Sequence, residues 1–309
     1  MESLPHTLAL FGGGGFVGGN LALAALRQGW TVHIVDSLEL PGVPGARWHR
    51  ADITEAAAVG ALLDQLRPDA VVDLAAVADI DRAERERDLA WAVNVEAARV
   101  IASASAALGS AFLYFSSDAV FAGTAARYTE EDPPSPVNYY GRTKAEGERA
   151  VLAAYPGAGI VRISLALGFP VTGGNSFFAA LEAGLRAGKE ITAPSDEVRT
   201  PVDVSTLSAC VLELLGMRHA GVIHIGSTDS IDRATLTRKA AALMGFPDAR
   251  IIAQPAAAQP IAVQLAESKP GRAPRHKNGI ISVAKAQRLL RTPLLTAEQS
   301  IRRAIVERS

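Results

Sequence analysis

A tyrosine and a lysine at the head of a helical segment, Tyr140 and Lys144, form the pair of side chains best suited to proton transfer. Residues at this spacing lie on one face of a helix, so the phenol and the ammonium group can act on the same molecule. A free phenol has a pKa of about 10, and a neighbouring positive charge lowers it by favouring the phenolate. Tyr139 falls on a different face from Lys144. The spacing therefore predicts Tyr140 as a general acid that protonates a carbonyl oxygen.

A hydroxyl that could assist this acid follows the short apolar run Ala111–Phe115, which reads as a buried strand. The run continues into Ser116, Ser117 and Asp118. Ligands bind at the carboxyl ends of the strands of an open parallel sheet, so these side chains are expected near the reacting group. We expect Ser117 to hydrogen-bond the substrate carbonyl and to share its polarisation with Tyr140.

A glycine-rich turn lies directly after the apolar run Leu8–Phe11 and directly before a helical segment. Its glycines, Gly12, Gly15 and Gly18, leave room for a pyrophosphate, which the free N–H groups and the positive end of the helix dipole would bind. A strand, such a turn and a helix form the fingerprint of dinucleotide binding. The turn therefore predicts a nicotinamide dinucleotide as cofactor, whose ribose hydroxyls Lys144 could hold.

Asp36 ends the next apolar run, Thr31–Val35, and lies 18 residues after Gly18. This is close to the separation of about 20 residues expected for the acid that binds the adenosine ribose hydroxyls. A carboxylate there repels a 2′-phosphate, so NAD is favoured as the cofactor and NADP is the alternative. Asp52, followed by Ile53, either meets the adenine edge or caps the helical segment that comes next.

The elements that must position these residues alternate between short apolar runs and longer amphipathic stretches. This alternation predicts an α/β fold with a Rossmann-type, doubly wound parallel sheet, because strands buried on both faces are continuously apolar. Residues 1–165 are expected to form the cofactor-binding domain, with 200–226 returning to it. A smaller C-terminal α/β substrate lobe is expected from 166–199 and 227–309. The predicted strands are Leu8–Phe11, Thr31–Val35, Ala70–Leu74, Ala111–Phe115, Ile160–Ile163 and Gly221–Ile225, and the predicted helices are 16–28, 54–66, 84–108, 140–154, 175–187, 203–216, 233–245, 283–291 and 296–307.

Composition narrows the class of protein. The chain has 309 residues, 49% of them hydrophobic, and a formal net charge of −1, so it can form a large core but lacks the global basic charge that attracts nucleic acid. Cys210 is the only cysteine, so no internal disulfide forms and an oxidising compartment is not required. The N-terminal apolar run is too short for a signal peptide or a membrane span. We therefore expect a cytoplasmic protein without a nucleic-acid or membrane partner, and no histidine spacing predicts a metal site.

The motifs together resemble the extended short-chain dehydrogenase/reductase family, and most closely its dTDP-4-dehydrorhamnose reductase-like branch. The resemblance implies a Rossmann lobe, a small C-terminal substrate lobe, a nucleotide-sugar substrate and a homodimer formed through the helices near 84–108 and 140–154. Besides the glycine turn and Asp36, the segments that carry the resemblance are Ala75–Glu84, Ala90–Asn94, Ser117–Gly123 and Pro136–Glu148, with a weaker extension over Arg199–Val204.

The chain departs from this branch at positions that line the sugar in the family. Val77, Ala78, Ala119 and Leu165 stand where reductases of the branch usually carry polar or aromatic residues. Related sugar dehydratases have a glutamate at the position of Ala119. Without that carboxylate the elimination of water lacks its acid–base group, so the sequence disfavours a dehydratase.

The resemblance also implies that two arginines bind the substrate diphosphate. Arg199 is the first. The second belongs to an R-P-G-D segment that reads Lys269-Pro-Gly-Arg272 here. Lysine lacks the guanidinium fork, so Arg272 or Arg275 could replace the missing arginine, and the alternative is a solvated loop.

The leading interpretation is an NAD(P)-dependent oxidoreductase that reduces a keto group of a nucleotide-linked sugar by hydride transfer. A second interpretation is an epimerase that retains NAD, and a third is a non-catalytic NAD(P)-binding regulatory subunit. The predicted catalytic residues are Tyr140, Lys144 and Ser117. The predicted cofactor contacts are Gly12, Gly15, Phe16, Val17, Gly18, Asp36, Asp52, Ile53, Leu74, Ala75, Ala76, Asn94, Ser116, Tyr140 and Lys144, and the predicted substrate contacts are Ser117, Asp118, Asn175, Arg199 and Arg272.

Overall fold

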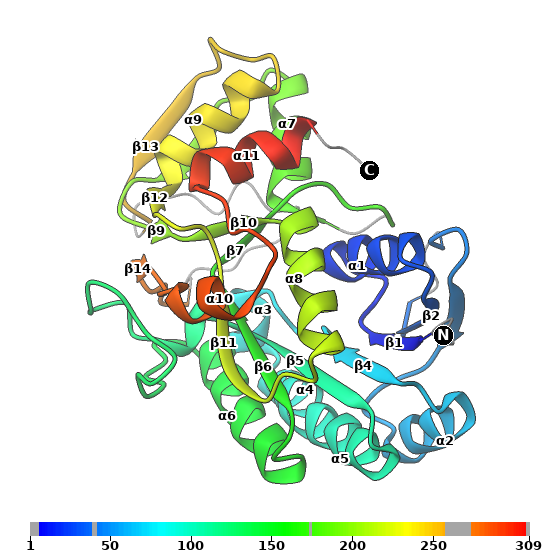
Figure 1. The fold of residues 1–309 in the computed structure, drawn as a ribbon. Coiled ribbons are helices and arrows are strands. Elements are labelled where there is room, and N and C mark those ends of the chain that lie inside the picture. The colour runs from blue at the N-terminus through cyan, green and yellow to red at the C-terminus, as the bar shows by residue number, and fades with distance from the viewer. Residues whose placement is uncertain (1–5, 39–41, 173–174, 257–272, 307–309) are drawn as a thin grey trace.

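A seven-stranded parallel sheet forms the centre of the larger part of the molecule, in the order β11-β6-β5-β4-β1-β2-β3 (Figure 1). The computed structural model describes residues 6–38, 42–172, 175–256 and 273–306. The strand order reverses where β1 lies between β2 and β4, which is the switch point of a doubly wound sheet. The strands of this sheet are β1 (Thr7–Phe11), β2 (Thr31–Asp36), β3 (Arg47–Arg50), β4 (Ala70–Asp73), β5 (Ala111–Ser117), β6 (Gly159–Ile163) and β11 (Gly221–Ile225).

Helices cover both faces of the sheet. They are α1 (Phe16–Arg27) and α8 (Val204–Gly216) on one face, and α2 (Ala56–Leu66), α5 (Ala98–Leu108) and α6 (Tyr139–Ala154) on the other. Successive strand residues point to opposite sides, so Leu8 and Leu10 of β1 pack in the core with α1 and α8, whereas Ala9 and Phe11 pack in the core with α2, α5 and α6. The Rossmann-type α/β fold predicted from the sequence is confirmed.

The continuous helix predicted over 84–108 is wrong. The chain instead forms α3 (Ile80–Arg85), α4 (Arg87–Trp91), a π-helical segment η1 (Ala92–Ala97) and then α5. The wider π turn is held at Asn94, because the Tyr114 hydroxyl donates to its main-chain carbonyl at 2.9 Å. The strand β3 was also missed, because its sequence, Arg-Trp-His-Arg, is not an apolar run and it lies at the edge of the sheet.

A smaller lobe lies at the carboxyl ends of the sheet strands, at the top of Figure 1. Its short strands are β7 (Leu165–Leu167) paired with β10 (Pro201–Asp203), β8 (Ile191–Pro194) paired with β13 (Ile251–Gln254), and the set β12 (Ile231–Asp232), β9 (Val198–Arg199) and β14 (Asn278–Gly279). Its helices are α7 (Phe177–Arg186), α9 (Arg233–Leu243) and α11 (Ala297–Val306), whose side chains Phe178, Leu236 and Ile301 share a separate core. The lobe therefore has its own hydrophobic cluster.

One element inside the predicted lobe range packs elsewhere. Helix α10 (Ala284–Leu289) contributes Ala286 to the core of the large sheet, and Leu290 joins it there. The chain therefore returns to the large sheet a second time before α11 re-enters the small lobe.

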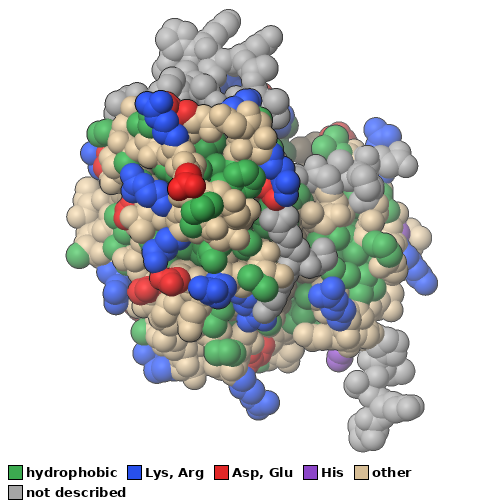
Figure 2. Space-filling view, turned by 90° about the horizontal axis from the view of Figure 1, so that it is seen from above, with side chains coloured by type: hydrophobic (Ala, Val, Ile, Leu, Met, Phe, Trp, Pro, Cys, Tyr) green, Lys and Arg blue, Asp and Glu red, His purple; other side chains and the backbone are tan. Residues whose placement is uncertain are grey.

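The surface of the small-lobe end carries charges of both signs. Figure 2 shows Lys and Arg side chains spread singly over the face seen from above, with acidic side chains between some of them. No helix of the described ranges combines the length and the apolar character needed to cross a membrane.

Candidate active site

A cleft of about 1130 Å³ lies between the carboxyl ends of the large-sheet strands and the small lobe. It is lined by the glycine turn after β1, the ends of β2, β4 and β5, and the head of α6 on one side. The other side is formed by small-lobe residues that include Asn175, Phe177, Arg199 and Arg233. Elements that the sequence predicted separately therefore meet at one place.

The glycine turn has the backbone that a dinucleotide requires. Gly12 has a φ of +71°, and a Cβ there would lie 2.7 Å from the main-chain Cα of Ala75. A Cβ on Gly18 would lie 2.6 Å from the Cα of Gly13, so only glycine lets the turn pack against α1. Helix α1 begins after Gly15 without a side-chain cap, which leaves main-chain N–H groups for an anion. The turn therefore fits a pyrophosphate, and Gly12, Gly15, Phe16, Val17 and Gly18 all line the cleft.

Asp36 and Asp52 both line the cleft. The Asp36 carboxylate accepts main-chain hydrogen bonds from Gly14 and Leu38, both at 3.1 Å. Asp52 accepts from the main-chain N–H of Thr54 at 2.9 Å and from its hydroxyl at 2.7 Å, and these bonds lower the pKa of Asp52. Because α2 begins only at Ala56, Asp52 stabilises the turn before the helix rather than capping the helix itself.

Among the other predicted cofactor contacts, Asn94 is the one that does not line the cleft. Its side-chain oxygen accepts from the Val77 N–H at 2.8 Å, and its amide donates to the Thr143 hydroxyl at 2.8 Å. Asn94 thus ties the segment after β4 to α6 beneath the cleft. Ile53, Leu74, Ala75, Ala76 and Ser116 do line the cleft.

Tyr140 reaches the end of β5 because α6 starts unusually close to it. The Asn138 side chain caps α6 by accepting from the Gly141 N–H at 2.8 Å. A Cβ on Gly141 would lie 2.0 Å from the Ala119 carbonyl oxygen, so glycine is what allows this approach. The Ser117 hydroxyl contacts both the Tyr140 phenol and, at 3.1 Å, the Asp118 carboxylate.

The phenol of Tyr140 is in its proton-donating form at neutral pH. Burial raises the pKa of Tyr140 to about 12, the hydrogen bond from Ser117 acts to lower it, and the Asp118 charge raises it further. We expected Lys144 to lower this pKa, but in the structure its charge influences Asp73 rather than the phenol of Tyr140.

Lys144 is buried beneath Tyr140 and faces two carboxylates. Its ammonium lies 3.9 Å from the centre of the Tyr114 ring. Burial lowers the pKa of Lys144, and the charges of Asp73 and Glu148 oppose that shift. Burial likewise raises the pKa of Asp73, which Lys144 opposes. Asp73 was missed because a single acid at the end of an apolar strand carries no distinctive spacing.

Glu148 extends this buried polar group. It forms a two-pronged ion pair with Arg162, at 2.6 and 2.8 Å, and accepts from the Ser116 hydroxyl at 2.5 Å. Its place one helical turn after Lys144 is the signal that could have identified it. The charges of Glu148 on α6 and Asp73 on β4 therefore favour the charged form of Lys144, although neither carboxylate is hydrogen-bonded to it.

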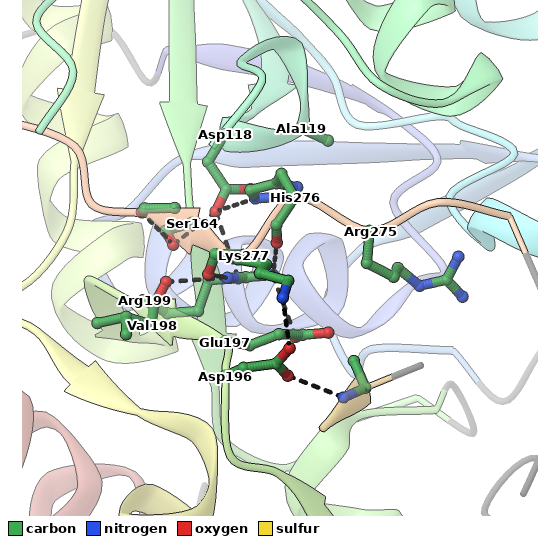
Figure 3. A network of polar contacts seen from close by, with 12 residues as sticks. Asp118, Ala119, Ser164, Asp196, Glu197, Val198, Arg199, Arg275, His276 and Lys277 are labelled. Atoms are coloured by element: carbon green, nitrogen blue, oxygen red, sulfur yellow. Dashed lines mark hydrogen bonds and ion pairs between the residues drawn. The ribbon is translucent and has the colours of Figure 1, made fainter. Parts of the chain in front are cut away.

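Asp118 and Arg199 meet in a network that joins the two sides of the cleft (Figure 3). The Asp118 carboxylate lies 3.5 Å from Arg199 Nε and 3.1 Å from His276 Nε2, and it accepts from the Ser164 hydroxyl at 2.7 Å. Burial acts to raise the pKa of Asp118, but the contacts with His276, Arg199 and Ser164 together lower it. The sequence did not identify His276 or Ser164, because both join Asp118 only through the fold.

The remaining contacts of Arg199 also lie within the protein. One terminal nitrogen donates to the Val198 and Lys277 carbonyls, and the other donates to the Glu197 carboxylate at 3.1 Å and to the His276 carbonyl. Arg199 lines the cleft, but its guanidinium is engaged on all sides. The geometry therefore favours a structural role over the predicted contact with a diphosphate.

Two other predicted substrate contacts have different outcomes. Asn175 is exposed and lines the cleft just before α7. Arg272 lies outside the described residues. Arg275, its alternative, forms a two-pronged ion pair with Asp81, at 2.9 and 3.1 Å, and so fastens the C-terminal segment to α3. Within the described ranges, no group of three or more His, Cys, Asp or Glu side chains is placed to hold a metal ion.

Comparison with known proteins gives a consistent family. A model of the RmlD substrate binding domain matches residues 6–309. The dTDP-4-dehydrorhamnose reductase of Mycolicibacterium smegmatis is 30% identical over 313 residues, which cover 99% of this chain and 86% of that protein. Methionine adenosyltransferase 2 subunit beta of Rattus norvegicus is 40% identical, but over 122 residues that cover 40% of this chain and only 36% of that protein.

Solved structures agree with the fold. The crystal structure of dTDP-4-dehydrorhamnose reductase from Bacillus anthracis in complex with NADP has a TM-score of 0.85 and 24% sequence identity, and the match covers 98% of this chain and 100% of that one. The chain therefore belongs to the RmlD substrate-binding domain family and is an NAD(P)-dependent oxidoreductase with an extended short-chain dehydrogenase/reductase fold.

Proposed function

We propose that this protein reduces the keto group of a nucleotide-linked sugar, with Tyr140 as the proton donor. The observation that carries the proposal is the convergence of Tyr140 and Ser117 in the cleft that the dinucleotide turn also lines. Reduction of a ketone needs a hydride at the carbon and a proton at the oxygen. A bound nicotinamide dinucleotide supplies the hydride, and this chain supplies the proton.

Each side chain has a distinct part in this chemistry. Tyr140 is protonated at neutral pH, because its pKa is about 12, so it can donate to the developing alkoxide. Ser117 is placed to hydrogen-bond the carbonyl oxygen. Lys144, whose charge is favoured by the charges of Asp73 and Glu148, would hold the cofactor ribose beside Tyr140. The Asp36 carboxylate favours NAD over NADP.

The test is a search for turnover with a defined substrate. Oxidation of NADH should be measured with dTDP-4-dehydrorhamnose and with UDP-linked 4-keto sugars, with identification of the reduced sugar by mass. We expect stoichiometric NADH loss with a nucleotide-linked keto sugar. Interconversion of sugar epimers without loss of NADH would instead establish an epimerase.

A second candidate is a regulatory subunit that binds NAD(P) without turning over a sugar. It is favoured by the local 40% identity to the methionine adenosyltransferase subunit. The complete Tyr140, Lys144 and Ser117 set argues against it, since a protein that only binds has no need of a proton donor in the cleft. Binding of NADH without turnover of any keto sugar in that screen would favour the second candidate.

We further propose a cytoplasmic homodimer formed through α5 and α6. The two helices pack together on one outer face of the large sheet, and the family resemblance implies an interface there. Sedimentation or light scattering of the purified chain should give twice the monomer mass, and a monomer at working concentration would contradict the proposal.

A further inference from the structure

Four arginines of the described residues line the cleft: Arg82, Arg199, Arg233 and Arg275. Three of them are paired with carboxylates at 2.9–3.1 Å, Arg82 with Glu86, Arg199 with Glu197 and Arg275 with Asp81. No described carboxylate lies within ion-pair distance of Arg233. Among the described residues, Arg233 is therefore the cleft arginine without an ion-pair partner.

The surroundings of Arg233 hold its side chain in place but do not neutralise it. It is the first residue of α9, and its guanidinium lies 4.2 Å from the centre of the Phe177 ring. Its Nε is buried and has no hydrogen-bond partner in the described structure. A buried donor without a partner is costly, so a ligand oxygen that accepted from Arg233 would offset that cost.

The charges nearby explain why an anion suits this position. Burial is the main influence that lowers the pKa of Arg233, to about 10; Glu197 and Asp118 oppose this, and Arg199 adds to it. Both carboxylates are already engaged by Arg199, at 3.1 and 3.5 Å. An anion beside Arg233 could therefore pair with its guanidinium without displacing a carboxylate that is already bound to it.

We propose that Arg233 binds the diphosphate of the substrate, taking the role that the sequence had suggested for Arg199. This inference rests on the proposed nucleotide-sugar reductase function. The cofactor pyrophosphate has its own cradle at the glycine turn on the opposite side of the cleft, so Arg233 is left for the substrate. Its neighbours in the lining, Asn175, Phe177 and Thr237, place it on the small-lobe side. The planar guanidinium can engage two phosphate oxygens at once.

The experiment compares a nucleoside with its diphosphate on the full chain saturated with NADH. Affinities for thymidine and for dTDP are measured by calorimetry for the wild type, Arg233→Gln and Arg233→Lys. Arg238→Gln serves as the matched control, because Arg238 lies on the exposed face of the same helix. Glutamine keeps a planar group over Phe177 but removes the charge.

We expect Arg233→Gln to weaken dTDP binding by about tenfold or more while thymidine and NADH affinities stay unchanged. Arg233→Lys should be intermediate, because it restores the charge without the fork, and Arg238→Gln should match the wild type. Unchanged dTDP affinity in Arg233→Gln, or a wild type that binds dTDP no better than thymidine, would overturn the inference.

The same variants separate this inference from the reductase itself. In one outcome, Arg233→Gln selectively loses dTDP binding, and the wild type oxidises no NADH with any nucleotide-linked keto sugar. That result would support the diphosphate contact and contradict the reductase. In the opposite outcome, the wild type reduces the sugar, and Arg233→Gln keeps normal dTDP binding and a normal KM. That result would support the reductase and contradict the diphosphate contact.

Discussion

The two sides of the cleft are built in different ways. The large-sheet side places Tyr140 against Ser117 by local means, a capped helix start and a glycine at 141 packed against the end of β5. The small-lobe side depends on Asp118 meeting Arg199 and His276, which come from distant parts of the chain. The proposed catalytic residues therefore lie where neighbouring segments of the sequence determine the geometry, whereas the opposite side of the cleft is held by ion pairs between distant segments.

The largest expected effect is a loss of turnover on the large-sheet side of the cleft. Tyr140→Phe should lower turnover by about 10²–10⁴-fold with little change in cofactor affinity, because it removes the proton donor and keeps the ring. Steady-state kinetics and NADH titration measure both quantities. Tyr139→Phe on the neighbouring residue is the control. Near-native turnover of Tyr140→Phe on a confirmed substrate would rule out the acid assignment.

The next effect concerns stability rather than chemistry. Arg199→Met should destabilise the fold by about 3–5 kcal/mol, because it leaves the buried Asp118 without a main partner. Denaturant unfolding of this variant can be set against Arg186→Met, which breaks an exposed pair on α7 and should change stability by about 0–1 kcal/mol. Equal stability of the two variants, with a raised KM for Arg199→Met alone, would return Arg199 to the role of a substrate ligand.

We expect acid to destabilise the folded protein in two separate pH ranges, one set by His224 and the other by Asp118. Burial lowers the pKa of His224 on β11 to about 3 from its ordinary 6.5, so the folded state binds this proton less tightly than the unfolded state. The folded state therefore loses stability relative to the unfolded state as the pH falls below 6.5, by about 3 kcal/mol near pH 4. The pKa of Asp118 is lowered from 3.8, so the stability it contributes is present above 3.8 and is lost only below it.

Melting temperatures between about pH 4 and 7 test this order of events. His224→Gln should flatten the slope over that range, even if the variant is less stable at neutral pH. A slope equal to that of the wild type would mean that His224 is not the group that titrates.

The smallest expected effect is on cofactor choice. Asp36→Ala should narrow the preference for NADH over NADPH by about tenfold, since it removes a carboxylate that repels the 2′-phosphate. Direct titration of both cofactors gives the ratio. If the wild type binds both cofactors equally well, Asp36 does not act at the ribose, and its hydrogen bonds to Gly14 and Leu38 only stabilise the turn.

The residues that the sequence singled out on the large-sheet side do line one cleft, and they could be found because their signals are local. The glycine turn, Asp36 and the Tyr140–Lys144 pair are each contained within one strand end, turn or helix start, where spacing determines position. The interruption of the helix at Asn94 was missed, because it depends on a hydrogen bond from Tyr114 on another element.

The small-lobe side could be anticipated only in part. Arg199 and Asp118 were both noted as charged residues near the substrate, but nothing in their spacing shows that they bind each other. Arg233 was not noted at all, because its role depends on what its neighbours do: Arg199 engages the nearby carboxylates, and Phe177 supports the guanidinium. Such a residue becomes visible only when the partners of every other charge are known.

The route of the chain through the network around Asp118 has a consequence for synthesis on the ribosome. The first six strands of the large sheet, up to β6, can pair as soon as the N-terminal half has emerged. Asp118 then stays solvated until Arg199 and, later, His276 have been synthesised and can contact it. A nascent chain should accordingly form its glycine turn early, and its cleft should close only after the segment that carries His276 has been made.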